Sequence, residues 1–146
     1  PEEQVEVIEN ARVVLLGMGR VGRGAYHFLQ SDFPGAVVGV DESFERTEAL
    51  KAKGIRCVHG DAADRDFWER AGVTDCEMLL VSLSSHREHC AVVRLARELG
   101  FTGTIAVTAS FDDEREELEQ LGCVAFNLYA DVGRGFAETA VEEHVA

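Results

Sequence analysis

A glycine-rich segment is the first part of this sequence whose residue types and spacing could do chemistry: Gly17-Met18-Gly19-Arg20-Val21-Gly22. It has the pattern G-x-G-x-x-G, follows an apolar run and opens a segment with helical spacing, the context in which this pattern binds a dinucleotide. Gly17 would permit the tight turn, Gly19 the approach of a phosphate, and Gly22 the contact between helix and strand. The free N–H groups at the start of the helix would attract an anion.

Arg20 lies inside this loop. Its guanidinium could hold a phosphate with two hydrogen bonds, and the alternative is a surface arginine. The helix that follows should face the sheet with Val21, Ala25, Phe28 and Leu29, because these residues lie at helical spacing.

An acidic pair follows the second apolar run. Asp41 stands 19 residues after Gly22, where a carboxylate can accept hydrogen bonds from both ribose hydroxyls, and we assign Glu42 to the same site. A carboxylate there would repel a 2′-phosphate, which favours NAD or a plain adenine nucleotide over NADP, although Arg46 nearby leaves this choice open. The alternative for Asp41 is a solvated residue in a strand-to-helix turn.

The third and fourth apolar runs end in residues that would line the same crevice. Asp61, in Gly60-Asp61-Ala62, could contact the adenosine portion or cap a helix, and Ser82, Leu83 and Ser84 would close the pocket from the other side. The predicted cofactor-binding residues are therefore Gly17, Met18, Gly19, Arg20, Val21, Gly22, Asp41, Glu42, Asp61, Ala62, Ser82 and Leu83.

The elements that position these residues recur at the spacing of a strand plus a helix. Apolar runs begin near Arg12, Ala36, Arg56, Met78, Thr104 and Cys123. The first four runs are too apolar to alternate between a buried and a solvated face, which is typical of parallel strands. Gly54, Gly100 and Gly122 stand where helices should end. We predict an α/β fold, a doubly wound parallel six-stranded Rossmann sheet in strand order 3-2-1-4-5-6.

Length and charge limit the classes of protein. The 146 residues predict one domain, 12–146, after an acidic lead-in, 1–11, and the segment 132–145 should be a helix that packs on the sheet or on another subunit. The net charge of −13 repels phosphate backbones, so nucleic acid is not an expected partner. Apolar stretches are far shorter than the roughly 20 residues that span a bilayer.

Metal binding and catalysis find little support in the sequence. The four cysteines show no CxxC and should be reduced. His86-x-x-His89-Cys90 could offer metal ligands from one helical face, but without a second ligand pair at recognisable spacing we expect no metal site and a packed Cys90. His59 and these histidines could approach a pocket, yet no orienting partner is evident. We therefore expect no enzymatic activity.

Together, these motifs resemble a known family, the nucleotide-binding N-terminal domain of regulators of potassium conductance (RCK), also called the KTN or TrkA-N domain. The resemblance covers 12–140, and its matching pieces are the Gly17 to Gly22 loop, Asp41, Gly60-Asp61-Ala62 and Leu80-Val81-Ser82-Leu83. The segments 66–70, 125–129 and 133–137 are similar to Kef-type, glutathione-gated potassium efflux antiporters.

The resemblance implies a cytoplasmic regulatory domain that forms a homodimer and binds NAD(H), AMP or another adenine nucleotide. The domain would transmit the ligand state to a membrane-embedded potassium channel or antiporter portion outside this chain, at the cytoplasmic face of the inner membrane. By position, the glycine loop would hold phosphate, Asp41 the ribose, and Asp61 with Ala62 the adenosine side.

Two other classes of function remain open. The first is the cofactor-binding fragment of an NAD-dependent oxidoreductase, which would turn over a substrate once a substrate domain is restored. The second is a protein-interaction module with a vestigial pocket, which would bind no nucleotide.

Overall fold

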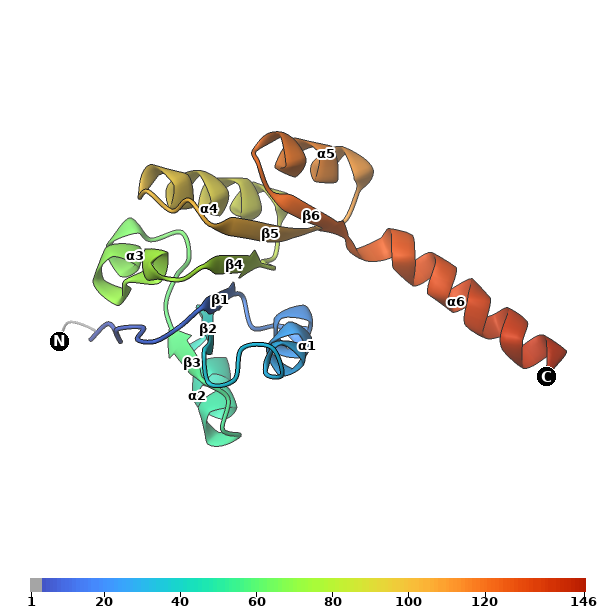
Figure 1. Ribbon diagram of the computed structural model, residues 1–146, viewed down its shortest axis with the longest axis horizontal. Helices are drawn as coiled ribbons and strands as arrows, with labels where there is room; N and C mark the ends of the chain where they lie inside the picture. Colours follow the sequence, from blue (N-terminus) through green and yellow to red (C-terminus); the bar gives the residue numbers. More distant parts are fainter. Residues whose placement is uncertain (1–3) are drawn as a thin grey trace.

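A single six-stranded parallel sheet organises the chain in the computed structural model, which describes residues 4–146 (Figure 1). The strand order is β3-β2-β1-β4-β5-β6, which confirms the predicted doubly wound Rossmann fold. The strands are β1 (Val13–Leu16), β2 (Val37–Asp41), β3 (Cys57–His59), β4 (Met78–Val81), β5 (Thr104–Ala109) and β6 (Val124–Asn127).

Helices connect the strands and cover the two faces of the sheet. They are α1 (Arg20–Leu29), α2 (Phe44–Ala52), α3 (Arg65–Ala71), the 3-10 turn η1 (Val73–Asp75), α4 (His86–Glu98), α5 (Asp112–Gln120) and α6 (Leu128–Val145). Side chains of α3, α4 and α5 pack with Val14 and Leu16, whereas side chains of α1 and α2 pack with Val13 and Leu15 on the opposite face. The chain reverses direction across the sheet between β1 and β4, which pair in parallel, and this is where a doubly wound sheet opens a ligand crevice.

Strands β1 and β2 are buried on both faces, as predicted. Every residue of β1 and β2 is buried. The prediction is wrong for β4, in which Met78 and Leu80 are only half-buried. The reason is that α1 lies over β1 and β2 and does not extend over the rest of this face. Met78 and Leu80 of β4 stand at the border of the covered part, and on β6 of the same face Val124 and Phe126 are 60% and 53% exposed.

Three helices end in the same way, as predicted from their glycines. Gly54, Gly100 and Gly122 have φ of +81°, +88° and +85°. Each glycine N–H donates to the carbonyl three residues earlier, and the next residue donates to the carbonyl five residues before it. These are Schellman-type ends, in which a left-handed residue satisfies the last carbonyls of the helix.

Helix α1 lies on the sheet only partly as predicted, because Ala25 and Leu29 pack against the core but Val21 and Phe28 do not. Val21 and Phe28 are 43% and 75% exposed, while Gly22 and Tyr26 are buried. A Cβ on Gly22 would lie 2.0 Å from the carbonyl oxygen of Gly17. The missing side chain therefore lets this face of the helix approach the loop, which turns Val21 and Phe28 toward solvent.

Helix α4 begins at a capped end. The Ser85 side chain accepts a hydrogen bond from the Glu88 backbone N–H and donates to the Glu88 carboxylate. The buried face of α4 comprises His89, Cys90, Val92, Val93 and Ala96.

The described part of the acidic segment, residues 4–11, lies against the domain. Ile8 is buried and its N–H donates to the Ala71 carbonyl at 2.8 Å. Glu6 pairs with Lys51 at 2.6 Å. Residues 1–3 of the predicted lead-in lie outside the described residues, and the boundary between 11 and 12 stays a prediction.

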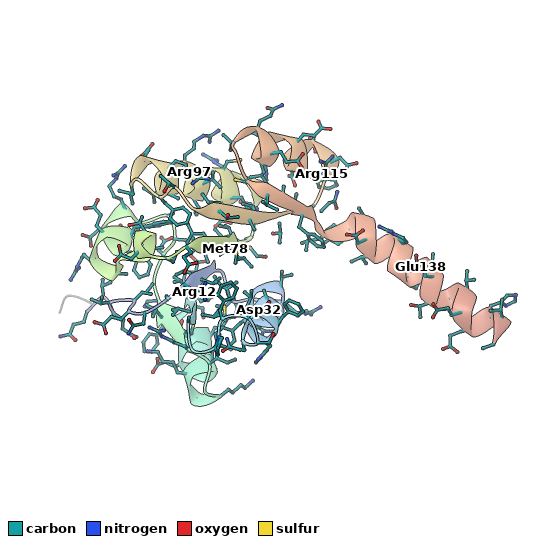
Figure 2. The ribbon with its side chains drawn as sticks, viewed as in Figure 1. Arg12, Asp32, Met78, Arg97, Arg115 and Glu138 are labelled. Carbon is teal, nitrogen blue, oxygen red and sulfur yellow. The ribbon has the colours of Figure 1, made fainter. Side chains whose placement is uncertain are left out.

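Helix α6 projects away from the sheet, and none of its residues is buried (Figure 1). Figure 2 shows its side chains, including Glu138, standing clear of the domain. The helix therefore does not pack on its own sheet, which was one of the two expectations for this segment. Within residues 4–146, no helix is both long and apolar enough to cross a membrane.

Candidate functional site

A crevice of about 660 Å³ opens at the carboxyl ends of β1 to β4. Ten of the twelve predicted binding residues line it: Gly17, Gly19, Arg20, Val21, Asp41, Glu42, Asp61, Ala62, Ser82 and Leu83. The other two shape it from behind. Met18 is fully buried beneath Gly39, and Gly22 supports the loop from within α1.

The glycine loop is held in one conformation by close backbone contacts. Gly17 has φ of +101°, and a Cβ there would lie 2.1 Å from the carbonyl oxygen of Ser82. Only glycine satisfies both conditions, because left-handed backbone and missing space each exclude a side chain. Gly19 has φ of −69° and open space where its Cβ would stand. Gly17 therefore shapes the loop, whereas Gly19 leaves room for a ligand.

The start of α1 forms the positive end of the crevice. Gly19 is the residue before the helix, and among the described residues no side chain caps its first turn. Arg20 is exposed and lines the crevice, and Arg23 donates to the Met18 carbonyl at 3.2 Å. Unpaired backbone N–H groups, the helix dipole and a guanidinium thus lie together, which is the arrangement that binds phosphate.

Asp41 is buried and already holds two backbone groups. One carboxylate oxygen accepts from the Met18 N–H at 2.9 Å, and the other accepts from the Ser43 N–H at 3.0 Å. Only 6% of Asp41 is exposed. This arrangement excludes the solvated-turn alternative for Asp41, because the carboxylate fixes the glycine loop and the start of α2.

Two further charges stand beside Asp41. Arg46 lies 3.4 Å from the Asp41 carboxylate, with 47% of its side chain exposed, and Glu42 is exposed at the mouth of the crevice. Arg46 therefore offsets part of the negative charge that would repel a 2′-phosphate. Glu42 is the more accessible of the two carboxylates.

The third strand contributes an ordered turn. The Asp61 carboxylate accepts from the Ala63 N–H at 2.8 Å, and the Ala62 carbonyl accepts from the buried Trp68 indole at 2.7 Å. The residue that caps α3 is Asp64, not Asp61. The helix-capping alternative for Asp61 is therefore wrong, and Asp61 is among the residues that line the crevice.

The far wall of the crevice is set by a buried histidine. The Leu83 N–H donates to His89 Nε2 at 2.8 Å. Burial lowers the pKa of His89, and the neighbouring His86 adds to this shift. The neutral ring acts as an acceptor that orients the turn after β4, so His89 supports the wall without entering the crevice.

Sequence reasoning missed several wall residues. Ser43, Glu88, Ser110 and Tyr129 also line the crevice, whereas Ser84 lines it as predicted. Ser110 directly follows β5, so the rule that ligands bind at the carboxyl ends of strands could have found it.

Burial disfavours the thiolate form of the four cysteines. Burial raises the pKa of Cys57 and Cys76 to about 11, and it also raises the pKa of Cys90 and Cys123. All four are free thiols.

A doubly wound sheet with a glycine loop at its reversal point defines a Rossmann-type domain. The family is more specific: the model of the TrkA-N domain matches residues 13–127, and the chain belongs to this family. This confirms the resemblance found in the sequence.

Two curated relatives are similar to this chain in sequence. The chain is 29% identical over 122 residues to YbaL of Escherichia coli K12, whose name describes a cation/proton antiporter. It is 30% identical over 89 residues to the glutathione-regulated potassium-efflux system protein KefC of Cronobacter sakazakii. The aligned regions cover 83% and 61% of this chain but only 22% and 14% of the two relatives. This chain thus corresponds to a small part of each relative.

Solved structures of similar fold include the following three. The TrkA-N domain of E. coli inner membrane protein YbaL is 27% identical, with a TM-score of 0.77 over 90% of this chain and 97% of that one. An AMP-bound Kef C-terminal domain from Shewanella denitrificans is 21% identical and gives a TM-score of 0.74, over 89% of this chain and 78% of that one. The GsuK channel bound to NAD is 18% identical and gives a TM-score of 0.78, over 91% of this chain and 24% of that one. The last two show the shared fold.

Proposed function

We propose that this domain binds an adenine nucleotide, NAD(H) or AMP, and regulates a potassium transport system, specifically a Kef-type potassium/proton antiporter. The observation that carries the proposal is the convergence of the uncapped α1 start, Arg20 and the acids Asp41, Glu42 and Asp61 on one crevice. A nucleotide has the matching groups, an anionic phosphate and a ribose with two hydroxyls.

The charges of the crevice suggest how the nucleotide lies. The phosphate would sit against the N–H groups of Gly19 and Arg20, where the helix dipole contributes about 0.3–1 kcal/mol. The ribose hydroxyls would donate to Glu42 and to the remaining lone pairs of Asp41. The adenosine side would contact Asp61 and Ala62.

The proposed role is regulatory, and two side chains that could transfer a proton are engaged by other partners. Lys51 pairs with Glu6 and Glu48, and His89 is engaged with the Leu83 backbone. The relatives are named as an antiporter and a potassium-efflux protein, which supports this reading over an oxidoreductase fragment. In the full-length protein the domain would lie at the cytoplasmic face of the inner membrane.

Regulation requires two arrangements that bind the nucleotide unequally, and a homodimer would supply them. An apolar groove runs over the uncovered face of the sheet, lined by residues that include Leu80, Ala106 and Phe126. Helix α6 carries exposed Val132 and Phe136 and leaves its own sheet. We infer that α6 packs in this groove on a second copy of the chain.

A titration followed by calorimetry and light scattering tests this function. We expect saturable binding of AMP or NADH at one site per chain, by a dimer. The Phe136→Asp variant should be a monomer, whereas Glu138→Gln on the opposite side of α6 should remain a dimer. A domain that binds no adenine nucleotide would contradict the proposed function and favour an interaction module.

A further inference from the structure

A group of three metal-binding side chains lies outside the nucleotide crevice. His86 is the first residue of α4, Cys90 lies one turn later on the same helix, and Glu117 projects from α5. The His86 Nε2 atom is 2.7 Å from a Glu117 carboxylate oxygen and 3.4 Å from the Cys90 sulfur. One ligand atom from each residue lies within 4.8 Å of the other two.

The Cys90 sulfur and the Glu117 carboxylate lie at the same nitrogen of His86, so the three side chains do not form a proton relay. A catalytic relay through histidine uses its two ring nitrogens, one toward the nucleophile and one toward the carboxylate. Here the same nitrogen, Nε2, faces both Cys90 and Glu117. The other nitrogen, Nδ1, is buried without a hydrogen-bond partner among residues 4–146. Three ligand atoms within 4.8 Å of one another, two of them facing a single ring nitrogen, suit an ion better than a proton transfer.

The distances agree with a tetrahedral site after a small movement. Zinc bonds of about 2.1 Å to nitrogen, 2.3 Å to sulfur and 2.0 Å to oxygen place tetrahedral ligands roughly 3.4–3.6 Å apart. The nitrogen-to-sulfur distance of 3.4 Å already fits. The carboxylate must retreat by about 0.7 Å to reach such a spacing, and the Glu117 side chain, 49% exposed, has room to do so.

The ligand set also selects the kind of ion. Nitrogen, sulfur and carboxylate oxygen together suit zinc and similar transition metals, whereas magnesium and calcium prefer oxygen alone. The exposed side of Glu117 leaves a fourth position for water. Glu114 on α5 adds negative charge nearby. We propose that His86, Cys90 and Glu117 form a zinc-type divalent metal site that ties α4 to α5.

This site differs from the one the sequence suggested and set aside. His89 belongs to the sequence cluster but is not a ligand, because its Nε2 accepts from the Leu83 N–H. Glu117, 31 residues from His86, takes its place. The fold supplies the partner that sequence spacing could not reveal.

Zinc titration of the metal-stripped domain in competition with a chromogenic chelator tests the site. We expect one zinc per chain in the wild type, and at least tenfold weaker binding by Glu117→Gln. The control Glu116→Gln changes an exposed neighbour that makes none of the contacts of this site, and it should bind like the wild type. Because Glu117 is exposed, its variant should fold, which circular dichroism verifies.

Cobalt substitution tests the sulfur ligand separately. Cobalt bound by the wild type should give a thiolate-to-metal charge-transfer band, which Cys90→Ala should abolish and the control Cys76→Ser should retain. A wild type that fails to hold zinc against the chelator would overturn the proposal. Equal zinc affinity in Glu117→Gln, or an unchanged cobalt band in Cys90→Ala, would overturn it as well. None of these outcomes depends on nucleotide binding.

Discussion

The Asp41 carboxylate accepts a hydrogen bond from the Met18 backbone N–H at 2.9 Å, which ties the end of β2 to the glycine loop. The second oxygen accepts from Ser43 at the start of α2. The residue that was expected to read the ribose therefore also builds the site. The loop geometry and the proposed contact with the ribose therefore depend on the same buried side chain.

Replacing Asp41 by alanine should weaken both the fold and nucleotide binding. The change leaves the N–H groups of Met18 and Ser43 without their acceptor, which costs about 1–3 kcal/mol for each group that stays buried. Urea unfolding should show this loss in Asp41→Ala. Asp61→Ala removes an exposed side chain that accepts a hydrogen bond from a single N–H, and this variant should lose far less stability. Equal stability of Asp41→Ala and the wild type would contradict the assigned role.

The glycines of the loop should separate binding from folding. Gly19→Val adds a side chain where the protein leaves space, so the fold should survive while phosphate approach is blocked and affinity falls at least tenfold. Gly17→Ala should instead destabilise the domain, because its Cβ would meet the Ser82 carbonyl. Calorimetry and thermal unfolding of both variants check this. Normal nucleotide binding by folded Gly19→Val would exclude the loop as the phosphate site.

Arg46 should set the discrimination between NADH and NADPH. It stands beside Asp41 with half of its side chain exposed, where it can pair with a 2′-phosphate. Arg46→Ala should therefore weaken NADPH more than NADH, by at least tenfold in the ratio, since a charged hydrogen bond contributes about 1.5–3 kcal/mol. Competition titrations measure the ratio, with Arg94→Ala on the surface of α4 as the control. Equal losses for both cofactors would show that Arg46 does not contact the 2′ position.

Cys57 should make stability fall at high pH. Burial raises its pKa from 9.0 to about 11, so the folded protein retains a proton that the unfolded chain releases. This contribution is fully present below pH 9 and is lost as the pH rises from 9 to 11. Urea midpoints across this range should therefore fall more steeply in the wild type than in Cys57→Ala. Parallel profiles would mean that the Cys57 thiol titrates normally.

The sequence predicts the strand order and ten of the crevice residues because both follow from local rules. Apolar runs, helix-ending glycines and the ends of strands repeat along the chain, and each can be read without knowing the packing. The orientation of α1 could not be read, because hydrophobic spacing favoured Val21 and Phe28 over a face that begins with the bare backbone of Gly22. Two further contacts could not be predicted, because each joins segments that are distant in the sequence. They are the hydrogen bond from the Met18 N–H to Asp41 and the contact of Glu117 with His86.

The most direct test of the nucleotide site is a backbone-amide NMR titration of the isotope-labelled domain with AMP and with NADH. We predict saturable shifts concentrated at the start of α1, at Glu42 and Ser43, and at 61–63, with small changes along α6. Shifts confined to other surfaces, or none at millimolar nucleotide, would contradict a nucleotide site in this crevice.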